Sequence, residues 1–512
     1  MPGAFSLSFL SLALYALESS AVSINMVRPP RPTWRQQMNA PRPPLAATDN
    51  NLINSNNLRY STNISIEGNI VNVLIDTGST DLWVMPPGGL KTFTDTGLSA
   101  TLRYGDAYLQ GKTQNGEEAD FAQGHFGILG LGFDTPGSSR INAAVLQAQG
   151  AASTVGNSVL SNIFAENATG SHYIGISLSR TGDEEGTADG SLTIAEYDSD
   201  YAAVANAPKL PQTPANSGVW SVVLDGLSVG GKKINWPTRL TTAVPSGKNI
   251  VLLDTGTTNI LMPGEQVNAI YSAIPGAVFS PNSNIPLAQF STTRDVWVVP
   301  CTATPSVVAS FGYDFPVHPL DVTDMQVLTT RDGKHSFTVC VNAFADIGTI
   351  VSTEADALFG DSFLRNVYSA YDFGTGGPTK GTPFVQLLSN TDATKSAAGL
   401  VSVRRQTMAG MPPELSPLDL VRVFNGTLDA ASAVPVTTAA LPSSTATSAG
   451  AAPTASAGGD APPPTGGSAG GNTDDNTNAG DKDDKKNGAV ASGPRTGVVG
   501  LVLALGVVSA LL

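Results

Sequence analysis

The chain has 512 residues, of which 41% are hydrophobic and only 14% are charged. Its formal net charge of −14 argues against a nucleic-acid-binding protein, because phosphate groups need a basic face. The low charge content and the 53 glycines favour a β-rich fold with many turns over a helical one.

The N-terminal segment, residues 1–23, has the pattern of a secretory signal peptide. An apolar run at 5–17 precedes small residues at 19–23 that suit cleavage. No basic residue comes before the run, and a buried N-terminal helix is the alternative. Three Asn-X-Ser/Thr tripeptides agree with a secretory route and mark expected glycosylation sites: Asn63, Asn167 and Asn425.

A stretch rich in Pro and Arg follows at residues 24–57. It holds four arginines and six prolines and cannot form a core of its own. Two interpretations stay open, a pro-segment laid over an acidic cleft or a linker.

Residues 58–390 alternate short apolar runs with Gly, Asn, Asp and Pro, which predicts β-strands joined by turns. Asp225-Gly226 and Gly230-Gly231 each predict a hairpin turn. Few helices are expected, at 141–149, at 263–273 and after Asp361. The strands expected with most support are 64–66, 70–75, 173–178, 191–194, 220–224 and 297–300.

An Asp-Thr-Gly motif occurs twice, at Asp76 and at Asp254, each time after an apolar strand. The aspartates lie 178 positions apart, so we expect two related lobes, 58–215 and 216–390, that each present one carboxylate. Two carboxylates placed face to face share a proton, because both cannot ionise cheaply. Such a pair can hold a water between an acid and a base, as amide hydrolysis requires. A solvated turn, the alternative for one copy, does not explain two.

The cysteines are Cys301 and Cys340. In an oxidising compartment they are expected to pair, which would stabilise the fold by roughly 4 kcal/mol. Two unpaired buried thiols are the alternative.

Residues 391–496, rich in Ser, Thr, Pro and Gly, are predicted to form a flexible stalk. The apolar run at 497–512 is short for a membrane-spanning helix. Small residues at 487–493 before this run match a signal for a glycosylphosphatidylinositol (GPI) lipid anchor. We therefore expect a cell-surface or cell-wall protein attached to the membrane through this lipid. A tail anchor or an adhesive terminus is the alternative.

These motifs together resemble those of the pepsin-like aspartic proteases, and the stalk and tail resemble the fungal secreted and cell-surface forms. The run from Asp76 to Val84 is similar to the family's first active-site loop, and the run from Asp254 to Pro263 is similar to the second. Residues 127–132 and 357–365 are similar to the elements that thread beneath these loops, and the cysteines lie where the family has a disulfide. The resemblance implies an all-β, bilobal fold with the active-site cleft between the lobes.

The resemblance also implies roles for individual residues. Asp76 and Asp254 would be catalytic. Tyr104, Gly105 and Asp106 would belong to a flap over the substrate, although Tyr104 alone could be ordinary strand packing. Trp83 would accept a hydrogen bond from the flap tyrosine or be plain core, and Thr258 would contact the substrate backbone. The residues expected to support the dyad are Thr77, Gly78, Ser79, Thr255, Gly256 and Thr257.

The N-terminal lobe departs from the family pattern behind the flap. Tyr104 and Phe126 lie only 22 positions apart, where the family has a longer set of strands. Phe126 replaces a common acidic residue, and the family's first disulfide is missing. We expect a trimmed lobe.

The expected function is that of a monomeric aspartic endopeptidase that cleaves extended peptide or protein substrates at acidic pH. No cofactor is expected, and the four histidines show no metal-ligand spacing. The competing class is an inactive homologue that binds surface partners. A structural wall glycoprotein would not explain two catalytic loops.

Overall fold

Residues 22–25 and, with gaps, 52–436 are the part of the chain that the computed structural model describes. All of them belong to one compact unit of the chain. The internal residues that are not described are 56, 67–68, 87–100, 105–106, 111–123, 136, 167, 169, 181–189, 241–243, 288–293, 348–354, 375–380 and 382.

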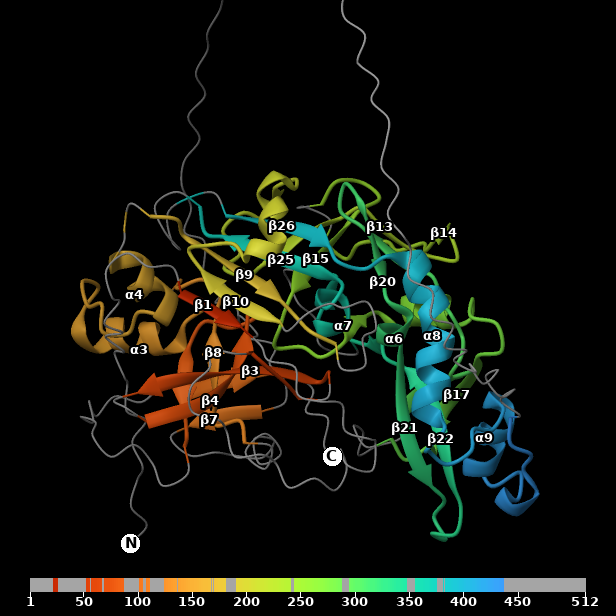
Figure 1. The fold of residues 1–512 in the computed structure, drawn as a ribbon. Coiled ribbons are helices and arrows are strands. Elements are labelled where there is room, and N and C mark those ends of the chain that lie inside the picture. Colours follow the sequence, from red (N-terminus) through yellow and green to blue (C-terminus); the bar gives the residue numbers. More distant parts are fainter. Residues whose placement is uncertain are drawn as a thin grey trace, which may run out of the picture. The chain divides into compact units, whose positions relative to one another are not determined.

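The N-terminal lobe is built on a five-stranded sheet in the order β2-β3-β4-β8-β5 (Figure 1). β4 runs parallel to β8, and β5 runs antiparallel to β8. β4 is buried from Val71 to Asp76, as strands with a parallel neighbour usually are. The strands are β2 (Ile53–Ser55), β3 (Arg59–Ile66), β4 (Asn69–Asp76), β5 (Leu82–Val84) and β8 (Gly127–Gly130).

The C-terminal lobe repeats this arrangement in a sheet of order β12-β15-β24-β16-β23. β15 runs parallel to β24, and β16 runs antiparallel to β24. The strand that leads to each Asp-Thr-Gly motif therefore has a parallel neighbour of the same kind in both lobes. The strands are β12 (Ser221–Leu224), β15 (Asn249–Leu253), β16 (Ile260–Met262), β23 (Ala345–Asp346) and β24 (Ala357–Phe359).

A six-stranded sheet of order β1-β10-β9-β25-β26-β11 joins the two halves of the chain. β9 pairs with β25 from Tyr173↔Asp372 to Ser177↔Tyr368, so strands of both halves share one hydrogen-bonded ladder. Residues 22 and 23, expected in the signal peptide, lie in β1, which pairs with β10. The strands are β1 (Val22–Asn25), β9 (Tyr173–Ser177), β10 (Ser191–Ile194), β11 (Leu210–Pro211), β25 (Val367–Asp372) and β26 (Phe384–Ser389).

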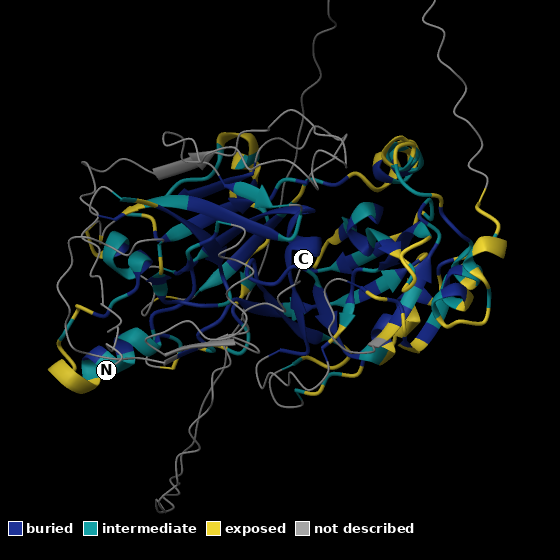
Figure 2. Ribbon diagram, turned by 90° about the horizontal axis from the view of Figure 1, so that it is seen from below, coloured by how far each residue is buried: buried dark blue, intermediate teal, exposed yellow. Residues whose placement is uncertain are grey.

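The hydrophobic core runs without a break from one lobe to the other, and the buried strands occupy the interior (Figure 2). Within it, the ring centroid of Trp220 lies 4.2 Å from that of Phe133 and 4.7 Å from that of Phe373. Aromatic burial on this scale stabilises by a few kcal/mol per ring. The core thus supports the strand ends that carry the two motifs.

The rest of the C-terminal lobe contains two four-stranded sheets. One has the order β14-β13-β19-β20 and the other β17-β18-β22-β21. Gly230 and Gly231, with φ of 55° and 75°, form the predicted hairpin turn between β13 and β14. The hairpin predicted at Asp225-Gly226 is wrong, because β12 pairs with β15 and β13 pairs with β14 and β19. A disulfide joins Cys301 to Cys340 of β22, as expected. The strands are β13 (Gly226–Val229), β14 (Lys232–Lys233), β17 (Val278–Ser283), β18 (Arg294–Val299), β19 (Val307–Ser310), β20 (Asp314–Val317), β21 (Thr323–Thr329) and β22 (Ser336–Asn342).

Sheets form the body of both lobes and helices lie outside them, so the prediction of an all-β, bilobal fold is confirmed. The predicted helices at 141–149 and 263–273 correspond to α3 and α5. α7, the helix expected after Asp361, is a short turn that begins at Asp361 itself, with Gly360 as its N-cap. The helices are α3 (Arg140–Gln149), α4 (Val159–Glu166), α5 (Gly264–Tyr271), α6 (Pro319–Val322), α7 (Asp361–Leu364), α8 (Ala393–Met408) and α9 (Pro417–Phe424), with 3₁₀ turns at Ser199–Asn206 and Ala430–Ser432.

The folded C-terminal lobe extends beyond residue 390, where the stalk was expected to begin. α8 contacts α6, and α9 contacts β17 and β18 of the outer sheet (Figure 1). Leu415, Leu420 and Val423 share a buried cluster with apolar residues of that sheet. The composition of the segment did not predict that it folds, because its few apolar residues are buried only when the sheet covers them. The N-terminal lobe also begins earlier in the chain than the predicted residue 58, since β2 lies inside the expected 24–57 pro-segment or linker.

Candidate active site

Each Asp-Thr-Gly motif begins where a buried strand ends. Asp76 is the last residue of β4, and its carbonyl oxygen accepts from Leu131 N at 2.8 Å. Asp254 follows β15, and its N–H donates to Phe359 O at 3.1 Å. The parallel strands β8 and β24 therefore fix the backbone from which each carboxylate projects.

Two threonines tie the motifs to each other across the lobes. Thr77 Oγ1 donates to Leu253 O at 2.9 Å and accepts from Thr255 N at 3.0 Å. Thr255 Oγ1 donates to Ile75 O at 3.2 Å and accepts from Thr77 N at 3.0 Å. Each hydroxyl satisfies one buried N–H and one buried C=O of the opposite lobe, and losing such a partner costs about 1–3 kcal/mol. This threonine pair holds the two strand ends in register.

The two carboxylates lie next to each other where the lobes meet. Both are buried, with 2% of Asp76 and 0% of Asp254 exposed. A Cβ atom on Gly78 would lie 2.5 Å from Asp254 Oδ1, and one on Gly256 would overlap Asp76 Oδ1. Each glycine thus lets its backbone pass against the carboxylate of the other lobe, which a larger residue would prevent.

Matching hydrogen bonds hold each carboxylate from its own loop. Gly78 N donates to Asp76 Oδ1, and Gly256 N donates to Asp254 Oδ1, both at 2.8 Å. Ser79 Oγ donates to Asp76 Oδ2, and Thr257 Oγ1 donates to Asp254 Oδ2 at 2.7 Å. The donors fix the orientation of both carboxyl groups.

The electrostatics of the two carboxyls are unequal. Burial raises the pKa of Asp254 well above its ordinary value, and the charge of Asp76 raises it further. Burial also raises the pKa of Asp76, but hydrogen bonds from Ser79, Asp254 and Gly78 work in the opposite direction. A proton shared by the pair is therefore held more strongly on Asp254, although the two titrate as one unit.

The sequence of the chain is similar to that of a known protein family. The family model described as eukaryotic aspartyl protease matches residues 108–377, just over half of the chain. The chain belongs to the eukaryotic aspartyl protease family. Asp254 lies inside the residues that the family model matches, whereas Asp76 precedes them and is joined to the site by the contacts described above.

Curated relatives of this chain include proteins from fungi. A probable aspartic-type endopeptidase CTSD of Arthroderma otae is 30% identical over 206 residues, which are 40% of this chain and 45% of that protein. The chain therefore spans less than half the length of this relative. Vacuolar protease A of the same organism is 26% identical over 384 residues, 67% of this chain and 83% of that protein. A solved aspartic proteinase of Irpex lacteus aligns with 67% of this chain and 97% of its own, at 17% identity and a TM-score of 0.44.

The segment expected to form the flap contains a two-stranded hairpin. β6 (Thr101–Tyr104) pairs with β7 (Ala107–Gln110), with Tyr104 opposite Ala107. The side chain of Tyr104, and Gly105 and Asp106 altogether, lie outside the described residues. Trp83 is 4% exposed and packs in one cluster with Leu102 of β6, which agrees with the core packing expected as one alternative, whereas its hydrogen bond with Tyr104 stays a prediction. Because an indole N–H can only donate, a bond to the tyrosine would run from Trp83 and not toward it.

The hydroxyl of Thr258, a residue expected to contact the substrate backbone, forms hydrogen bonds within the protein, and the substrate contact stays a prediction. Its hydroxyl donates to Leu58 O at 2.8 Å and accepts from Arg59 Nη1 at 2.7 Å. Both partners belong to the N-terminal lobe, so the hydroxyl joins the lobes.

Sequence reasoning missed the charged residues behind the second loop. Asp361 is buried, and its Oδ1 has no hydrogen-bond partner among the described residues. Burial raises the pKa of Asp361 well above its ordinary value, while the charges of Arg365 and Arg59 work in the opposite direction. Asp361 and Arg59 lie 302 positions apart, and no sequence motif pairs residues over such a separation, so only the fold could reveal this.

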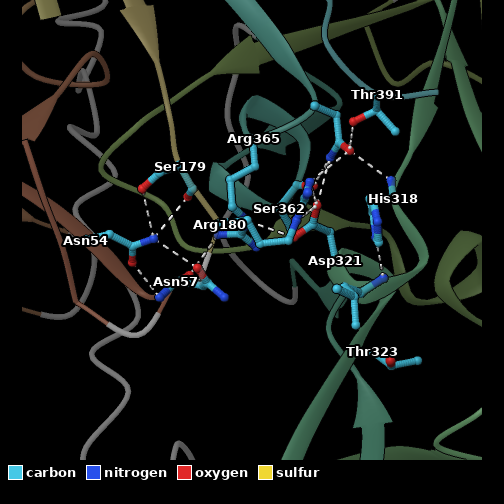
Figure 3. A network of polar contacts seen from close by, with 12 residues as sticks. Asn54, Asn57, Ser179, Arg180, His318, Asp321, Thr323, Ser362, Arg365 and Thr391 are labelled. Atoms are coloured by element: carbon cyan, nitrogen blue, oxygen red, sulfur yellow. Dashed lines mark hydrogen bonds and ion pairs between the residues drawn. The ribbon is translucent and has the colours of Figure 1, made fainter. Parts of the chain in front are cut away.

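A second missed feature is a buried network around Asp321 (Figure 3). Its carboxylate accepts from Arg180 Nη2 at 2.6 Å and from Arg365 Nε at 2.7 Å. Although burial opposes ionisation, the charges of Arg180 and Arg365 hold the pKa of Asp321 below its ordinary value. Arg365 Nη1 also donates to Asn57 O at 2.7 Å, so the network reaches the turn between β2 and β3.

The expected glycosylation sites differ in their surroundings. Asn63 lies half-buried in β3, where its Oδ1 accepts from Asn72 Nδ2 at 3.2 Å. Asn425 is exposed at the end of α9. Asn167 lies outside the described residues.

The described residues also bear on metal binding and on membrane-spanning helices. No group of three or more His, Cys, Asp or Glu within the described ranges could hold a metal ion. None of the helices in that same part of the chain is long and apolar enough to cross a membrane.

Proposed function

We propose that the chain is an aspartic endopeptidase that hydrolyses peptide bonds of extended polypeptides at acidic pH. The observation that carries this proposal is the pair of adjacent buried carboxyls, Asp76 and Asp254, each held by a backbone N–H and a hydroxyl of its own loop. An ionised and a protonated carboxyl side by side can act as base and acid on one water.

The unequal pKa shifts support different starting roles for the two carboxyls. We assign the shared proton to Asp254, whose pKa is raised more strongly, and the negative charge to Asp76. The oxygen of the water attacks the scissile carbonyl carbon while Asp76 takes a proton from that water. At the same time Asp254 donates its proton to the carbonyl oxygen. The tetrahedral intermediate then collapses, and the dyad delivers a proton to the leaving nitrogen. The C–N bond breaks without a covalent link to the protein.

The other site residues support this dyad. Gly78, Ser79, Gly256 and Thr257 orient the carboxyls, and Thr77 and Thr255 keep them in register. Tyr104, Gly105 and Asp106 would cover the substrate from the β6–β7 hairpin and exclude water, with Trp83 packed against that hairpin.

A peptide library cleaved at several pH values tests the proposal. Cleavage should follow a bell-shaped profile on the acid side of neutrality, because one carboxyl must be ionised and the other protonated. A statine-type peptide, which mimics the tetrahedral intermediate, should inhibit at far lower concentrations than a substrate peptide of the same sequence. An alkaline optimum or resistance to the statine peptide would contradict the proposal.

We also propose that the protein passes through the secretory pathway and is held at the cell surface by a GPI lipid. The signal-like residues 1–23, the polar stalk and the small residues before the apolar 497–512 run support this order of processing. The predicted stalk would then begin after residue 436 and keep the catalytic lobes away from the membrane. Phosphatidylinositol-specific phospholipase C should release the protein from membranes. Mass spectrometry that finds Leu512 in the membrane-bound form would contradict the anchor.

A further inference from the structure

The turn between β2 and β3 is held from the opposite lobe at two successive carbonyl groups. Asn57 O accepts from Arg365 Nη1 at 2.7 Å, and Leu58 O accepts from Thr258 Oγ1 at 2.8 Å. Arg59, the first residue of β3, closes this contact because its Nη1 donates to Leu58 O at 3.0 Å and to Thr258 Oγ1 at 2.7 Å. We call Leu58, Arg59 and Thr258 the clasp.

Hydrogen-bond directions in the clasp follow from the side chains themselves. A guanidinium can only donate, so Thr258 Oγ1 accepts from Arg59 and sends its single proton to Leu58 O. Arg59 is 6% exposed and Thr258 is 9% exposed. Charge-assisted hydrogen bonds in such a setting are stronger and better oriented than those on a surface.

The clasp acts on the second active-site loop. Thr258 follows Thr257, whose hydroxyl donates to Asp254 Oδ2 at 2.7 Å. The backbone on the far side is also fixed, because Asp361 N donates to Thr257 O at 2.8 Å and Ser362 N donates to Thr258 O at 3.0 Å. Arg59 thus holds one side of the segment that orients Asp254, and α7 holds the other.

We propose that Arg59 is a positioning residue for the reaction, which ties the second active-site loop to the N-terminal lobe and places a fixed positive charge beside its acids. This inference rests on the proposed function. It adds to the threonine pair a second tie between the lobes, which carries charge.

The charge of Arg59 should affect the pH dependence of the reaction. Its positive charge opposes the rise in the pKa of Asp361. The same charge lies close to Asp254, because Arg59 binds Thr258 and the neighbouring Thr257 binds that carboxyl, so it directly favours the ionised form of Asp254. Several charged or titratable groups among the described residues lie around Asp254 and Asp361. These groups are Asp76, Asp254, Asp321, Asp361, Arg59, Arg365, Tyr60 and Tyr371.

Three variants separate hydrogen bonding from charge. Arg59→Gln removes the charge and keeps a donor, Arg59→Lys keeps the charge on a shorter group, and Thr258→Val removes the hydroxyl. Arg331→Gln, at an exposed arginine of the β21–β22 hairpin, is the matched control for net charge. Measurements of kcat, KM and thermal midpoint against pH are made on the full chain.

We expect Arg59→Gln to lower kcat/KM about tenfold or more and to move the limb at higher pH upward by roughly half a pH unit or more. Arg59→Lys should keep the wild-type pH profile, and Thr258→Val should lower kcat with the profile unchanged. Arg331→Gln should match the wild type. If Arg59→Gln changes only the thermal midpoint, with kcat/KM and the pH profile at wild-type values, the inference is overturned while the proposed function stands. A wild-type chain that cleaves no peptide overturns both.

Discussion

The two Asp-Thr-Gly loops follow the same backbone course but rest on different side chains. In each lobe a glycine stands at the end of the parallel neighbour strand, since Gly130 is the last residue of β8 and Gly360 directly follows β24. The next residue is Leu131 in the N-terminal lobe and Asp361 in the C-terminal lobe. Leu131 belongs to the apolar core, and its carbonyl accepts from Trp220 Nε1 at 3.1 Å.

The second loop thus has an acid where the first has a leucine. Asp254 lies near Asp361, and the two negative charges disfavour each other. A repeated backbone therefore does not produce two equal carboxyls, because the pKa of each depends on its burial, its hydrogen bonds and the charges near it. In the proposed mechanism, this inequality assigns the acid role to one carboxyl and the base role to the other.

Replacing either aspartate is expected to have the largest effect. Asp76→Asn and Asp254→Asn should each lower kcat by roughly four orders of magnitude or more, because a dyad acts as a unit. Peptide cleavage measures the loss, and Asp200→Asn, at an exposed aspartate, serves as the control. Turnover within about tenfold of the wild type in either variant would show that the loops do not form one site.

Substitutions in the threonine pair test whether the two lobes contribute equally to holding the strand ends at Asp76 and Asp254 in register. Thr77→Val and Thr255→Val each leave a buried N–H and a buried C=O without a partner, so each should reduce the free energy of unfolding by about 2–4 kcal/mol. Displacement of the carboxyls should also reduce kcat/KM about tenfold or more. Denaturant unfolding and peptide kinetics measure both effects, with Thr77→Ser and Thr255→Ser as controls that keep the hydroxyl. Unequal losses from the two Val variants would mean that one strand end is held by other contacts.

Asp361→Asn removes the charge that distinguishes the two loops. The pKa of Asp361 is raised in the folded state, so its contribution to stability is complete below the ordinary pKa of 3.8 and is lost as the pH rises through the folded value. The variant should therefore gain stability relative to the wild type as the pH is raised from about 4 to about 7, because it lacks the buried carboxyl whose ionisation the folded state disfavours. Thermal unfolding across this range measures the gain. A difference that stays constant with pH would show that Asp361 does not titrate there.

Asp81 provides a smaller effect of the same kind in the N-terminal lobe. Its carboxylate accepts from Ser139 Oγ at 2.6 Å and Arg140 N at 2.9 Å at the start of α3, while burial raises its pKa to about 6. Stability from this group is complete below pH 3.8 and is lost as the pH rises through about 6. At about pH 4, Asp81→Asn should be less stable than the wild type, because a hydrogen bond at the helix end is lost. Between about pH 4 and about pH 7, the free energy of unfolding of the variant should rise by about 2 kcal/mol relative to that of the wild type. Parallel unfolding curves at both pH values would refute this account.

Much of the fold and of the site could be predicted from the sequence, because the decisive features are local. An apolar run predicts the buried strand before each aspartate, and a glycine two positions later is what the close approach of the opposite carboxylate requires. The hydroxyls of Ser79 and Thr257 follow at the same spacing in both loops. The pairing of Cys301 with Cys340 is likewise expected from the sequence, and the structure joins them.

The segment from 391 to 436 shows where local patterns stop being informative. Its Ala-, Ser- and Thr-rich stretches suggest a stalk, yet α8 and α9 form there. Leu400 and Leu420 are buried only because the folded lobe supplies the opposite surface. Composition reports how many apolar residues a segment has, and not whether a partner surface exists to cover them.

The sequence by itself determined the two motifs, their shared strand-and-turn setting and hence the family, since each depends on a few neighbouring residues. Only the tertiary structure decided which carboxyl holds the proton more strongly and what fixes the second loop. Arg59 and Thr258 meet although 199 positions separate them, and Asp361 lies near Asp254 although the two are 107 positions apart in the chain. Contacts at such separations, and the burial that shifts a pKa, arise from packing of the whole chain, which no local pattern encodes.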